Sequence, residues 1–244
     1  AMGEAGGLDL YRLLVPERHG GAEAGRPDDA RHVDVRSLVV ARELLGGLSA
    51  AADSIFAVQG LGSYPVSAFG SEAQRARILP GVLAGTRIGA FGLTEPASGS
   101  DARTMKTFAE RQGDGSYVLN GSKNWITNGP HAEHIIVFAI STQDPHKPKH
   151  TALILKKGMP GFTVAEPDHK LGIHAAHSCT IFFENVRVPK EYVLGEDGWG
   201  FKIAMSTLDG GRIGIAAQAL GIAQAAYEKS VEYAKEREAF GVPI

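Results

Sequence analysis

One stretch organises this sequence: Phe91-Gly-Leu-Thr-Glu-Pro-Ala-Ser-Gly-Ser-Asp101. An apolar run from Ile88 to Leu93 leads into it and predicts a strand. Pro96 has no amide hydrogen, so a central strand has to end before it. The small residues Ala97 to Ser100 leave their amides open to close approach by a flat or anionic ligand, and the hydroxyls of the stretch add uncharged donors and acceptors. Taken alone, the stretch also fits an ordinary exit from a strand into a loop.

The composition is that of a globular protein, with 244 residues of which 43% are hydrophobic and 21% charged. The net charge of -2 gives no basic field that would attract nucleic acid or an anionic membrane. A single cysteine, Cys179, excludes an intramolecular disulfide and fits a reducing compartment. No apolar run is long enough to predict a membrane span. The start of the chain, Ala1 to Gly7, lacks a signal-peptide pattern and suggests a sequence entered partway.

The hydrophobic pattern of residues 8–88 predicts helices. An apolar stripe at helical spacing runs from Val33 to Leu45, and the segment Ser49 to Gly62 is small and apolar, which suits close helix packing. Ser71-Glu-Ala-Gln74 has the pattern of a capping box and predicts a short helix that stops at Pro80-Gly81.

The hydrophobic period changes to that of strands between residues 88 and 194. Turn signals at Asp114-Gly115, Asn120-Gly121 and Asn128-Gly129 separate the runs. Strands at this spacing without intervening helices predict an antiparallel barrel or sandwich. The predicted strands are Ile88–Thr94, Thr104–Glu110, Tyr117–Asn120, Lys123–Thr127, His134–Ser141, Thr151–Lys156, Phe162–Ala165 and Cys179–Phe183.

Residues 199–238 predict one long helix with a broad apolar face. Four glycines, Gly210, Gly211, Gly214 and Gly221, each weaken this helix by about 1 kcal/mol relative to alanine, which indicates that another helix or a ligand comes close. The sequence stops soon afterwards at Ile244, and the long apolar face has no partner in it. We therefore expect a truncated chain.

Two further features could join the stretch at 91–101 in one site. Alternation along a strand puts Trp125 and Thr127 on one sheet face and Ile126 on the other. The indole could pack on an aromatic ring system while the hydroxyl bonds its heteroatom edge, although a core tryptophan beside a surface threonine is the simpler interpretation. Asp209 and Arg212 lie at i and i+3 on the long helix, so they either bind a polar ligand together or form a solvated ion pair.

Four separated motifs, in this order, resemble those of the acyl-CoA dehydrogenase family. They are Phe91-Gly-Leu-Thr-Glu-Pro-x-x-Gly-Ser-Asp101, Leu119-Asn-Gly-x-Lys-x-Trp-Ile-Thr-Asn128, Phe183-Glu-Asn-Val-Arg-Val-Pro189 and Gly195-x-x-Gly-x-Gly-Phe201. The segment Leu208 to Gly221 is most similar to the short-chain (butyryl-CoA) branch. The resemblance implies an α+β protein with an N-terminal helical domain over residues 1–88, incomplete at its start. A middle antiparallel β-barrel-like domain follows over 89–194, and residues 195–244 supply the first helix of a C-terminal helical bundle in which the chain is cut off.

The resemblance also implies FAD as the cofactor and no metal. The FAD-binding residues would be Phe91, Leu93, Thr94, Ser100, Trp125, Ile126 and Thr127, with Trp125 packed against the flavin and the Thr127 hydroxyl near its N5 atom. Arg237 and Phe240 would reach the FAD of a neighbouring subunit, where an arginine suits pyrophosphate oxygens. The acyl-CoA substrate would contact Ser100, Asp209 and Arg212.

The implied reaction is the α,β-dehydrogenation of a short- or branched-chain acyl-CoA to the trans-2-enoyl-CoA, a step of fatty acid β-oxidation. A carboxylate removes the α-proton while the β-hydrogen leaves as hydride to flavin N5. Electrons would pass to an electron-transfer flavoprotein. The full-length protein would be a homotetramer, a dimer of dimers, in the cytoplasm of a bacterium or the mitochondrial matrix of a eukaryote.

The catalytic base is missing from this sequence. Most of the family carries it far along the C-terminal domain, beyond Ile244, and a minority carries it directly before the helix arginine. The second position is Gly211 here. We therefore expect the base after Ile244 and expect no turnover by the fragment alone. Two alternatives stay open: an acyl-CoA oxidase of the same fold that uses oxygen, and a non-catalytic scaffold or binding member.

The segment Leu171-Gly-Ile-His-Ala-Ala-His-Ser-Cys179 departs from the family, which usually has arginine where His174 stands. His174, His177 and Cys179 offer three metal ligands without a clear fourth. We therefore expect strand-edge histidines beside a buried cysteine.

Overall fold

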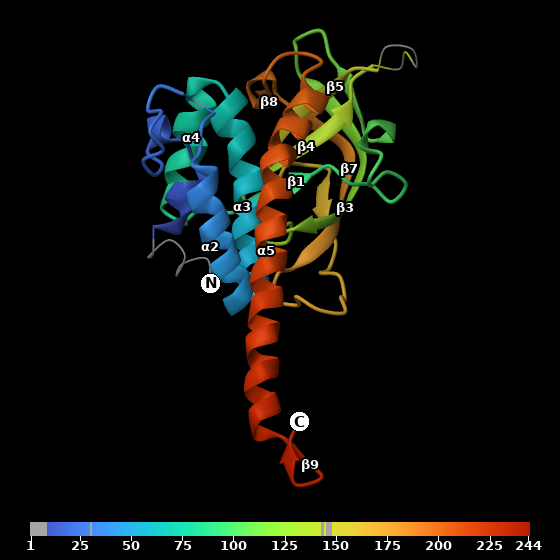
Figure 1. The fold of residues 1–244 in the computed structure, drawn as a ribbon. Helices are drawn as coiled ribbons and strands as arrows, with labels where there is room; N and C mark the ends of the chain where they lie inside the picture. Colours follow the sequence, from blue (N-terminus) through green and yellow to red (C-terminus); the bar gives the residue numbers. More distant parts are fainter. Residues whose placement is uncertain (1–8, 30, 143, 145–147) are drawn as a thin grey trace.

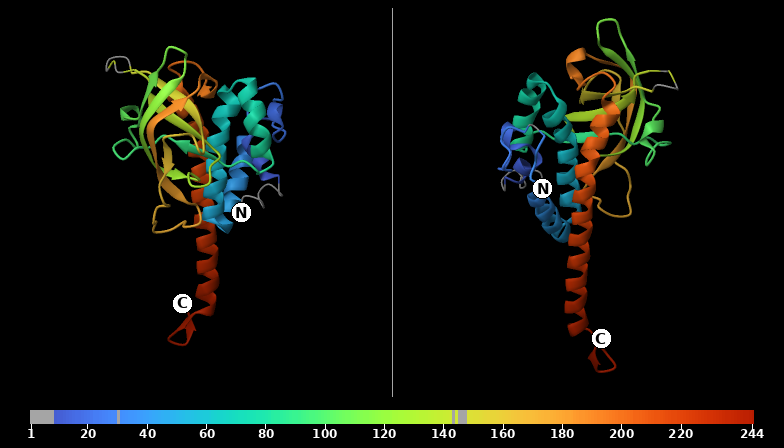
Figure 2. Two further views of the ribbon diagram at one scale, coloured as in Figure 1. Left: turned by 180° about the vertical axis from the view of Figure 1, so that it is seen from behind. Right: turned by 45° about the horizontal axis from the view of Figure 1, so that its top comes forward.

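The computed structural model describes residues 9–29, 31–142, 144 and 148–244, and it arranges them as a helical layer, a β-sheet and one long helix (Figure 1). Figure 2 shows the long helix α5 (Gly200–Glu236) running beside both the helical layer and the sheet, which also pack directly on each other through α3 and β1. The helix α5 contacts α2 and α3 of the helical layer and β5 of the sheet, and then extends beyond both. The expected α+β fold class is confirmed.

The helical layer follows the capping signals of the sequence. Its elements are the 3-10 helices η1 (Leu10–Leu14) and η2 (Glu17–His19) and the helices α2 (Val35–Leu48), α3 (Ala50–Phe69) and α4 (Glu72–Leu83). The capping box is confirmed, because the Ser71 hydroxyl accepts the Gln74 N–H and the Gln74 side chain accepts the Ser71 N–H. The predicted stop at Pro80 is wrong. Pro80 lacks only its own N–H, and its carbonyl still accepts the Ala84 N–H at 3.0 Å, so α4 continues to Leu83.

The middle region forms an eight-stranded sheet in the order β6-β7-β3-β2-β4-β5-β8, with β1 beside β4. Most neighbours are antiparallel as predicted, but β1 and β2 pair with β4 in parallel. The strands are β1 (Gly89–Gly92), β2 (Phe108–Arg111), β3 (Tyr117–Thr127), β4 (His134–Ile140), β5 (His150–Lys156), β6 (Phe162–Val164), β7 (Ser178–Val188) and β8 (Val193–Leu194). Shorter elements are η3 (Ala102–Thr104), η4 (Lys190–Tyr192) and a terminal hairpin of β9 (Glu238–Ala239) and β10 (Val242–Pro243).

Several strand predictions were wrong in their bounds; β7, for example, continues to Val188, five residues past the predicted end at Phe183. Asn120-Gly121 is a bulge inside β3 rather than a turn: Gly121 has φ 133°, and the register with β7 shifts between Leu119 and Gly121. The Asn120 side chain accepts the Asn185 N–H at 2.8 Å, which holds β7 alongside the bulge. The strand expected from Thr104 begins only at Phe108, because residues 102–104 form η3.

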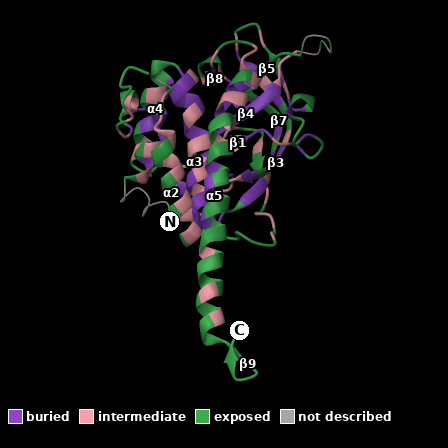
Figure 3. Cartoon of the chain, in the orientation of Figure 1, coloured by how far each residue is buried: buried purple, intermediate pink, exposed green. Residues whose placement is uncertain are grey.

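The core lies on both faces of β4. Alternate residues of this strand join two different clusters, with Ile135 and Val137 on the face toward β3 and β7, and Ile136 and Phe138 on the face toward the helices. Figure 3 shows the buried residues concentrated in the sheet and the adjoining helices, while the last turns of α5 are mostly exposed. Within the described residues, none of the helices has the length and apolarity needed to cross a membrane.

The helix α5 crosses α2 at small residues. A Cβ added at Gly221 would lie 1.9 Å from the carbonyl oxygen of Glu43, and one at Gly214 would lie 2.1 Å from Nη1 of Arg42. The Arg42 guanidinium is itself held in a buried ion pair with Asp53 on α3, with Nη2 and Oδ2 2.7 Å apart. These contacts confirm that another helix comes close at these two glycines.

A buried histidine makes stability depend on pH. His134 is completely buried, its Nε2 lies 3.1 Å from the Gly62 carbonyl oxygen, and burial lowers its pKa to about 4. An unfolded histidine takes up its proton near pH 6.5, so the unfolded chain binds more protons between these two values. We expect the free energy of unfolding to fall by about 3 kcal/mol as the pH drops through this window.

The variant His134→Gln keeps a donor for the Gly62 carbonyl and removes the titration. Urea unfolding at several pH values should therefore show a shallower loss of stability below about pH 6.5 in the variant. Equal slopes for the two proteins would contradict this assignment.

Candidate functional site

The strand β1 carries the organising stretch to the edge of the sheet beside β3. The Asn124 N–H donates to the Thr94 carbonyl at 2.8 Å, so the loop after β1 is bonded to β3 one residue before Trp125. The Lys123 ammonium donates to the Leu93 carbonyl at 3.0 Å. The two segments that the sequence singled out are therefore neighbours in space.

A buried ion pair between Lys123 and Glu95 fixes the loop that follows β1. The Lys123 ammonium lies 2.7 Å from Glu95 Oε1, and the Glu95 carboxylate also accepts the N–H groups of Lys106 at 2.6 Å and Thr107 at 3.0 Å. Burial alone raises the pKa of Glu95, but the charge and hydrogen bond of Lys123 and the bonds from Thr107 and Lys106 outweigh it, so the pKa is lowered. Burial lowers the pKa of Lys123 to about 8.

Sequence reasoning missed this pair. Both residues belong to the quoted motifs. A lysine on the core side of a predicted strand indicates a buried charge that needs a partner, and this signal was not used. The partners are 28 residues apart, however, and only the fold brings them together.

The small-residue loop is fixed by its own hydrogen bonds. Glu95 and Ser98 exchange two backbone bonds of 2.9 and 3.1 Å, which close a tight turn around Pro96. The Ser98 hydroxyl donates to the Asp101 carbonyl at 2.8 Å, and so does the Thr104 hydroxyl. The loop is therefore shaped before any ligand binds.

Trp125 is held out of the core by an irregularity in β3. The register with β7 shifts between Lys123 and Ile126, and Trp125 takes φ 59°, a conformation that a bulky residue rarely adopts. Its side chain is 57% exposed, whereas Ile126 is buried. The interpretation as a core tryptophan is therefore wrong. Such a backbone outlier at an exposed aromatic residue is typical of a ligand site.

A cavity of about 560 Å³ joins the loop to Trp125 and to α5. Among the residues expected from the sequence, it is lined by Phe91, Leu93, Thr94, Ser100, Trp125, Ile126 and Arg212. Gly99, from the small-residue stretch that the sequence singled out, also lines it, as do Arg103 and Phe201, which were not expected. The cavity combines aromatic faces with uncharged hydroxyls and two guanidinium groups.

Gly99 shows that the cavity wall suits a flat ligand. Its φ lies outside the left-handed region, and an added Cβ would meet no protein atom within 4 Å. Neither the backbone nor the packing of the chain therefore requires glycine there. The open space beside Gly99 leaves the loop backbone accessible to a flat ligand ring.

Four expected residues do not line this cavity: Thr127, Asp209, Arg237 and Phe240. Thr127 is half-buried, pairs with Ser178 of β7 and does not line the cavity. Asp209 and Arg212 are exposed and bonded to each other at 2.9 Å, as the ion-pair interpretation expected. Arg237 and Phe240 are exposed at the far end of α5, remote from the cavity of the same chain (Figure 1).

A second cavity of about 400 Å³ lies between η1, α2, α3 and α5. Leu61 of α3 lines both cavities, so the two adjoin at this residue. Asp209 and Gly211 line the second cavity from α5, and its wall is mainly apolar, with Leu38 and Tyr64 opposite. A ligand with a polar head in the first cavity has room for an apolar group in the second.

The side chains of His174, His177 and Cys179, in and before β7, do not come together as a metal site. His174 Nε2 lies 2.7 Å from the Lys170 carbonyl, and His177 Nδ1 lies 2.8 Å from His131 Nε2. Cys179 is buried beneath Ile126, and burial raises the pKa of its thiol to about 12. No cluster of three metal-ligating side chains occurs in the part of the chain that the structure describes.

Comparison with protein families matches the whole length of the chain. The N-terminal domain of acyl-CoA dehydrogenase matches residues 1–86, the middle domain residues 90–186 and the C-terminal domain residues 198–244. The short-chain specific acyl-CoA dehydrogenase of Megasphaera elsdenii is 47% identical over 97% of this chain and 61% of its own length.

Solved structures agree with this match. Butyryl-CoA dehydrogenase from Megasphaera elsdenii superposes with a TM-score of 0.89 at 44% identity, over 99% of this chain and 62% of that one. The FAD complex of acyl-CoA dehydrogenase from Bacillus anthracis gives a TM-score of 0.87 at 34% identity, over 99% and 40%. The chain spans about three fifths of the curated relatives that it matches, as the 61% coverage of the Megasphaera elsdenii protein illustrates.

Proposed function

The chain belongs to the acyl-CoA dehydrogenase family, and from that premise we propose that the protein is a flavoenzyme that dehydrogenates a short- or branched-chain acyl-CoA to the trans-2-enoyl-CoA. One observation carries the proposal. The small-residue loop after β1 and the exposed Trp125 line a single cavity, although they are separated by a strand and a hairpin in the sequence.

The FAD would be held by residues already brought to this cavity. Trp125 and Phe91 would supply aromatic surface. The backbone of Leu93 and the hydroxyls of Thr94 and Ser100 would supply hydrogen bonds, and Ile126 would supply an apolar contact. We propose that the Thr127 hydroxyl, which follows in β3, bonds the heteroatom edge of the ring. The bound flavin supplies a two-electron acceptor for the hydride that leaves the β-carbon.

The substrate would lie along α5. Arg212 and Ser100 face the first cavity, and Asp209 fixes the Arg212 guanidinium through their ion pair. The acyl chain would extend past Leu61 into the apolar second cavity. Closure of both cavities around the substrate would exclude water from the reacting carbons.

The base is proposed to come from outside these residues. Gly211 precedes Arg212 and carries no side chain, and the Asp209 carboxylate is exposed and engaged with Arg212. We therefore assign the removal of the α-proton to a carboxylate beyond Ile244, so that the 244-residue chain binds substrate without turning it over.

The partners and assembly of the whole protein are part of the same proposal. Electrons would pass to an electron-transfer flavoprotein, within fatty acid β-oxidation in the cytoplasm or the mitochondrial matrix. Arg237 and Phe240, exposed beyond the body of the molecule, would reach the FAD of a neighbouring subunit in a homotetramer.

The flavin site is tested by filling the space at Gly99. We expect the protein to bind FAD with a visible flavin spectrum, and we expect Gly99→Val to weaken FAD binding at least tenfold, because the added side chain would occupy the ring's place. Thermal stability should not change, since the Cβ would meet no protein atom within 4 Å.

Gly113→Val is the matched control. This glycine also has open space around it and an ordinary φ, but it lies in the β2–β3 hairpin, outside the cavity. Its FAD affinity should equal that of the wild type. Equal affinity in both variants would contradict the flavin site, and a protein that binds no FAD would favour the scaffold alternative. Oxygen consumption by the complete protein with substrate would identify an oxidase.

A further inference from the structure

Arg103 is a cation on the wall of the first cavity that has no role in the site described above. It belongs to η3, directly after the small-residue loop, and its guanidinium carbon lies 4.4 Å from the centroid of the Phe201 ring. Phe201, at the start of α5, lines the same cavity. The ring of the buried His150 packs against Phe201 with centroids 5.5 Å apart, so the aromatic platform under Arg103 is supported from β5.

Arg103 is exposed, and its charge has no ion-pair partner among the described residues. Among the described residues, its guanidinium takes part in no hydrogen bond or ion pair, only in the contact with Phe201. The other cations here are engaged, since Arg212 is paired with Asp209 and Lys123 with Glu95. Asp101 lines the same cavity but forms no ion pair with Arg103. Contact with an aromatic face leaves the five N–H donors at the edge of a guanidinium available to an anion.

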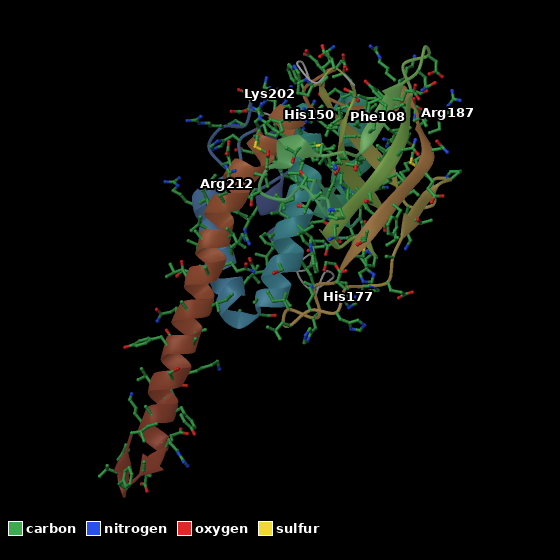
Figure 4. All side chains as sticks on the ribbon, turned by 90° about the vertical axis from the view of Figure 1, so that its right-hand side faces the viewer. Phe108, His150, His177, Arg187, Lys202 and Arg212 are labelled. Atoms are coloured by element: carbon green, nitrogen blue, oxygen red, sulfur yellow. The ribbon has the colours of Figure 1, made fainter. Side chains whose placement is uncertain are left out.

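The Phe201 ring, which Arg103 contacts, and Arg212 belong to different turns of α5. Phe201 and Arg212 are separated by 11 residues of α5, which corresponds to about 16 Å along the helix axis. Figure 4 shows His150 and Lys202 near the beginning of α5 and Arg212 further along it. A long ligand can contact both arginines at once. An acyl-CoA has this form, because its pantetheine arm separates the thioester from the phosphate groups.

We propose that Arg103 binds a phosphate group of the CoA moiety and so sets the preference for CoA thioesters over thioesters of the pantetheine arm alone. A guanidinium matches phosphate oxygens with two parallel hydrogen bonds, which a point charge cannot do. This inference rests on the proposed function. The phosphates of FAD offer the same chemistry, so the experiment has to separate the two sources.

Binding of CoA and of pantetheine to the flavin-loaded protein, measured by calorimetry, tests the proposal. We expect Arg103→Met to weaken CoA binding about tenfold or more, because a charge-assisted hydrogen bond is lost. Pantetheine binding and flavin content should stay at the wild-type level. Arg103→Lys keeps the charge without the fork and should fall between the two.

Lys202→Met is the matched control, because it removes the same charge from the residue next to Phe201. Lys202 lies over the Trp199 ring at 3.9 Å and does not line the cavity, so its loss should change CoA affinity less than about twofold.

Three results would overturn the inference for Arg103 alone. The first is CoA affinity in Arg103→Met equal to that of the wild type. The second is an equal loss of CoA and pantetheine binding, which would mean that Arg103 only supports Phe201. The third is a loss of flavin with unchanged CoA affinity, which would assign the phosphate to the cofactor. A wild-type protein that binds flavin but neither CoA nor pantetheine would overturn the proposed function itself.

Discussion

Gly221→Ala is expected to lower the free energy of unfolding by about 3 kcal/mol, at the upper end of the usual cost of overpacking. The added Cβ would lie 1.9 Å from the Glu43 carbonyl oxygen and 3.0 Å from the Gly47 nitrogen. Both are backbone atoms of α2, so the clash is relieved only if α2 and α5 move apart. Urea unfolding of the two proteins measures the difference.

Gly210→Ala provides the control on the same helix. An added Cβ there would meet no atom within 4 Å, so alanine should stabilise the helix by up to about 1 kcal/mol through its higher propensity. The two substitutions are chemically identical, but they should change the free energy of unfolding in opposite directions. Equal effects would show that the α2–α5 crossing is not as close as described.

Lys123→Met is the second substitution with a large expected effect, a loss of about 3–5 kcal/mol in the free energy of unfolding. It leaves the Glu95 carboxylate buried without its counter-ion, which lies 2.7 Å away in the wild type. The loop after β1 is bonded to the same ammonium through the Leu93 carbonyl, so FAD affinity should fall as well. Unfolding and flavin titration measure the two effects separately.

The double variant Glu95→Gln, Lys123→Met tests the physical reason. Removing both charges should cost less than the sum of the two single changes, because no uncompensated charge stays buried. Additive losses would mean that the residues contribute through packing rather than through their charges.

Local signals in the sequence predicted local structure well. The capping box at Ser71 and Gln74, the long helix through residue 236 and most of the strand runs depend on neighbours a few residues apart, and all appear in the structure. Asn120-Gly121 failed as a turn signal because the pairing of β3 with β7 outweighs the turn preference of two residues. Pro80 failed for a similar reason, since the packing of α4 tolerates one missing hydrogen bond.

Contacts distant in sequence account for the rest of the candidate site. The motifs identified the loop and Trp125, but not the bulge that turns the indole outward or the ion pair that fixes the loop. Arg103 carries no motif signal, and its contact with Phe201 joins residues 98 positions apart, as their numbers show.

The central claim is that one cavity binds a flavin beside an acyl-CoA, and a single titration tests it most directly. The visible absorption spectrum of the FAD-loaded 244-residue chain is recorded while butyryl-CoA is added. We predict a saturable shift of the flavin bands, because the substrate would bind against the ring. A flavin spectrum that butyryl-CoA leaves unchanged, or a chain that takes up no flavin, would contradict the account.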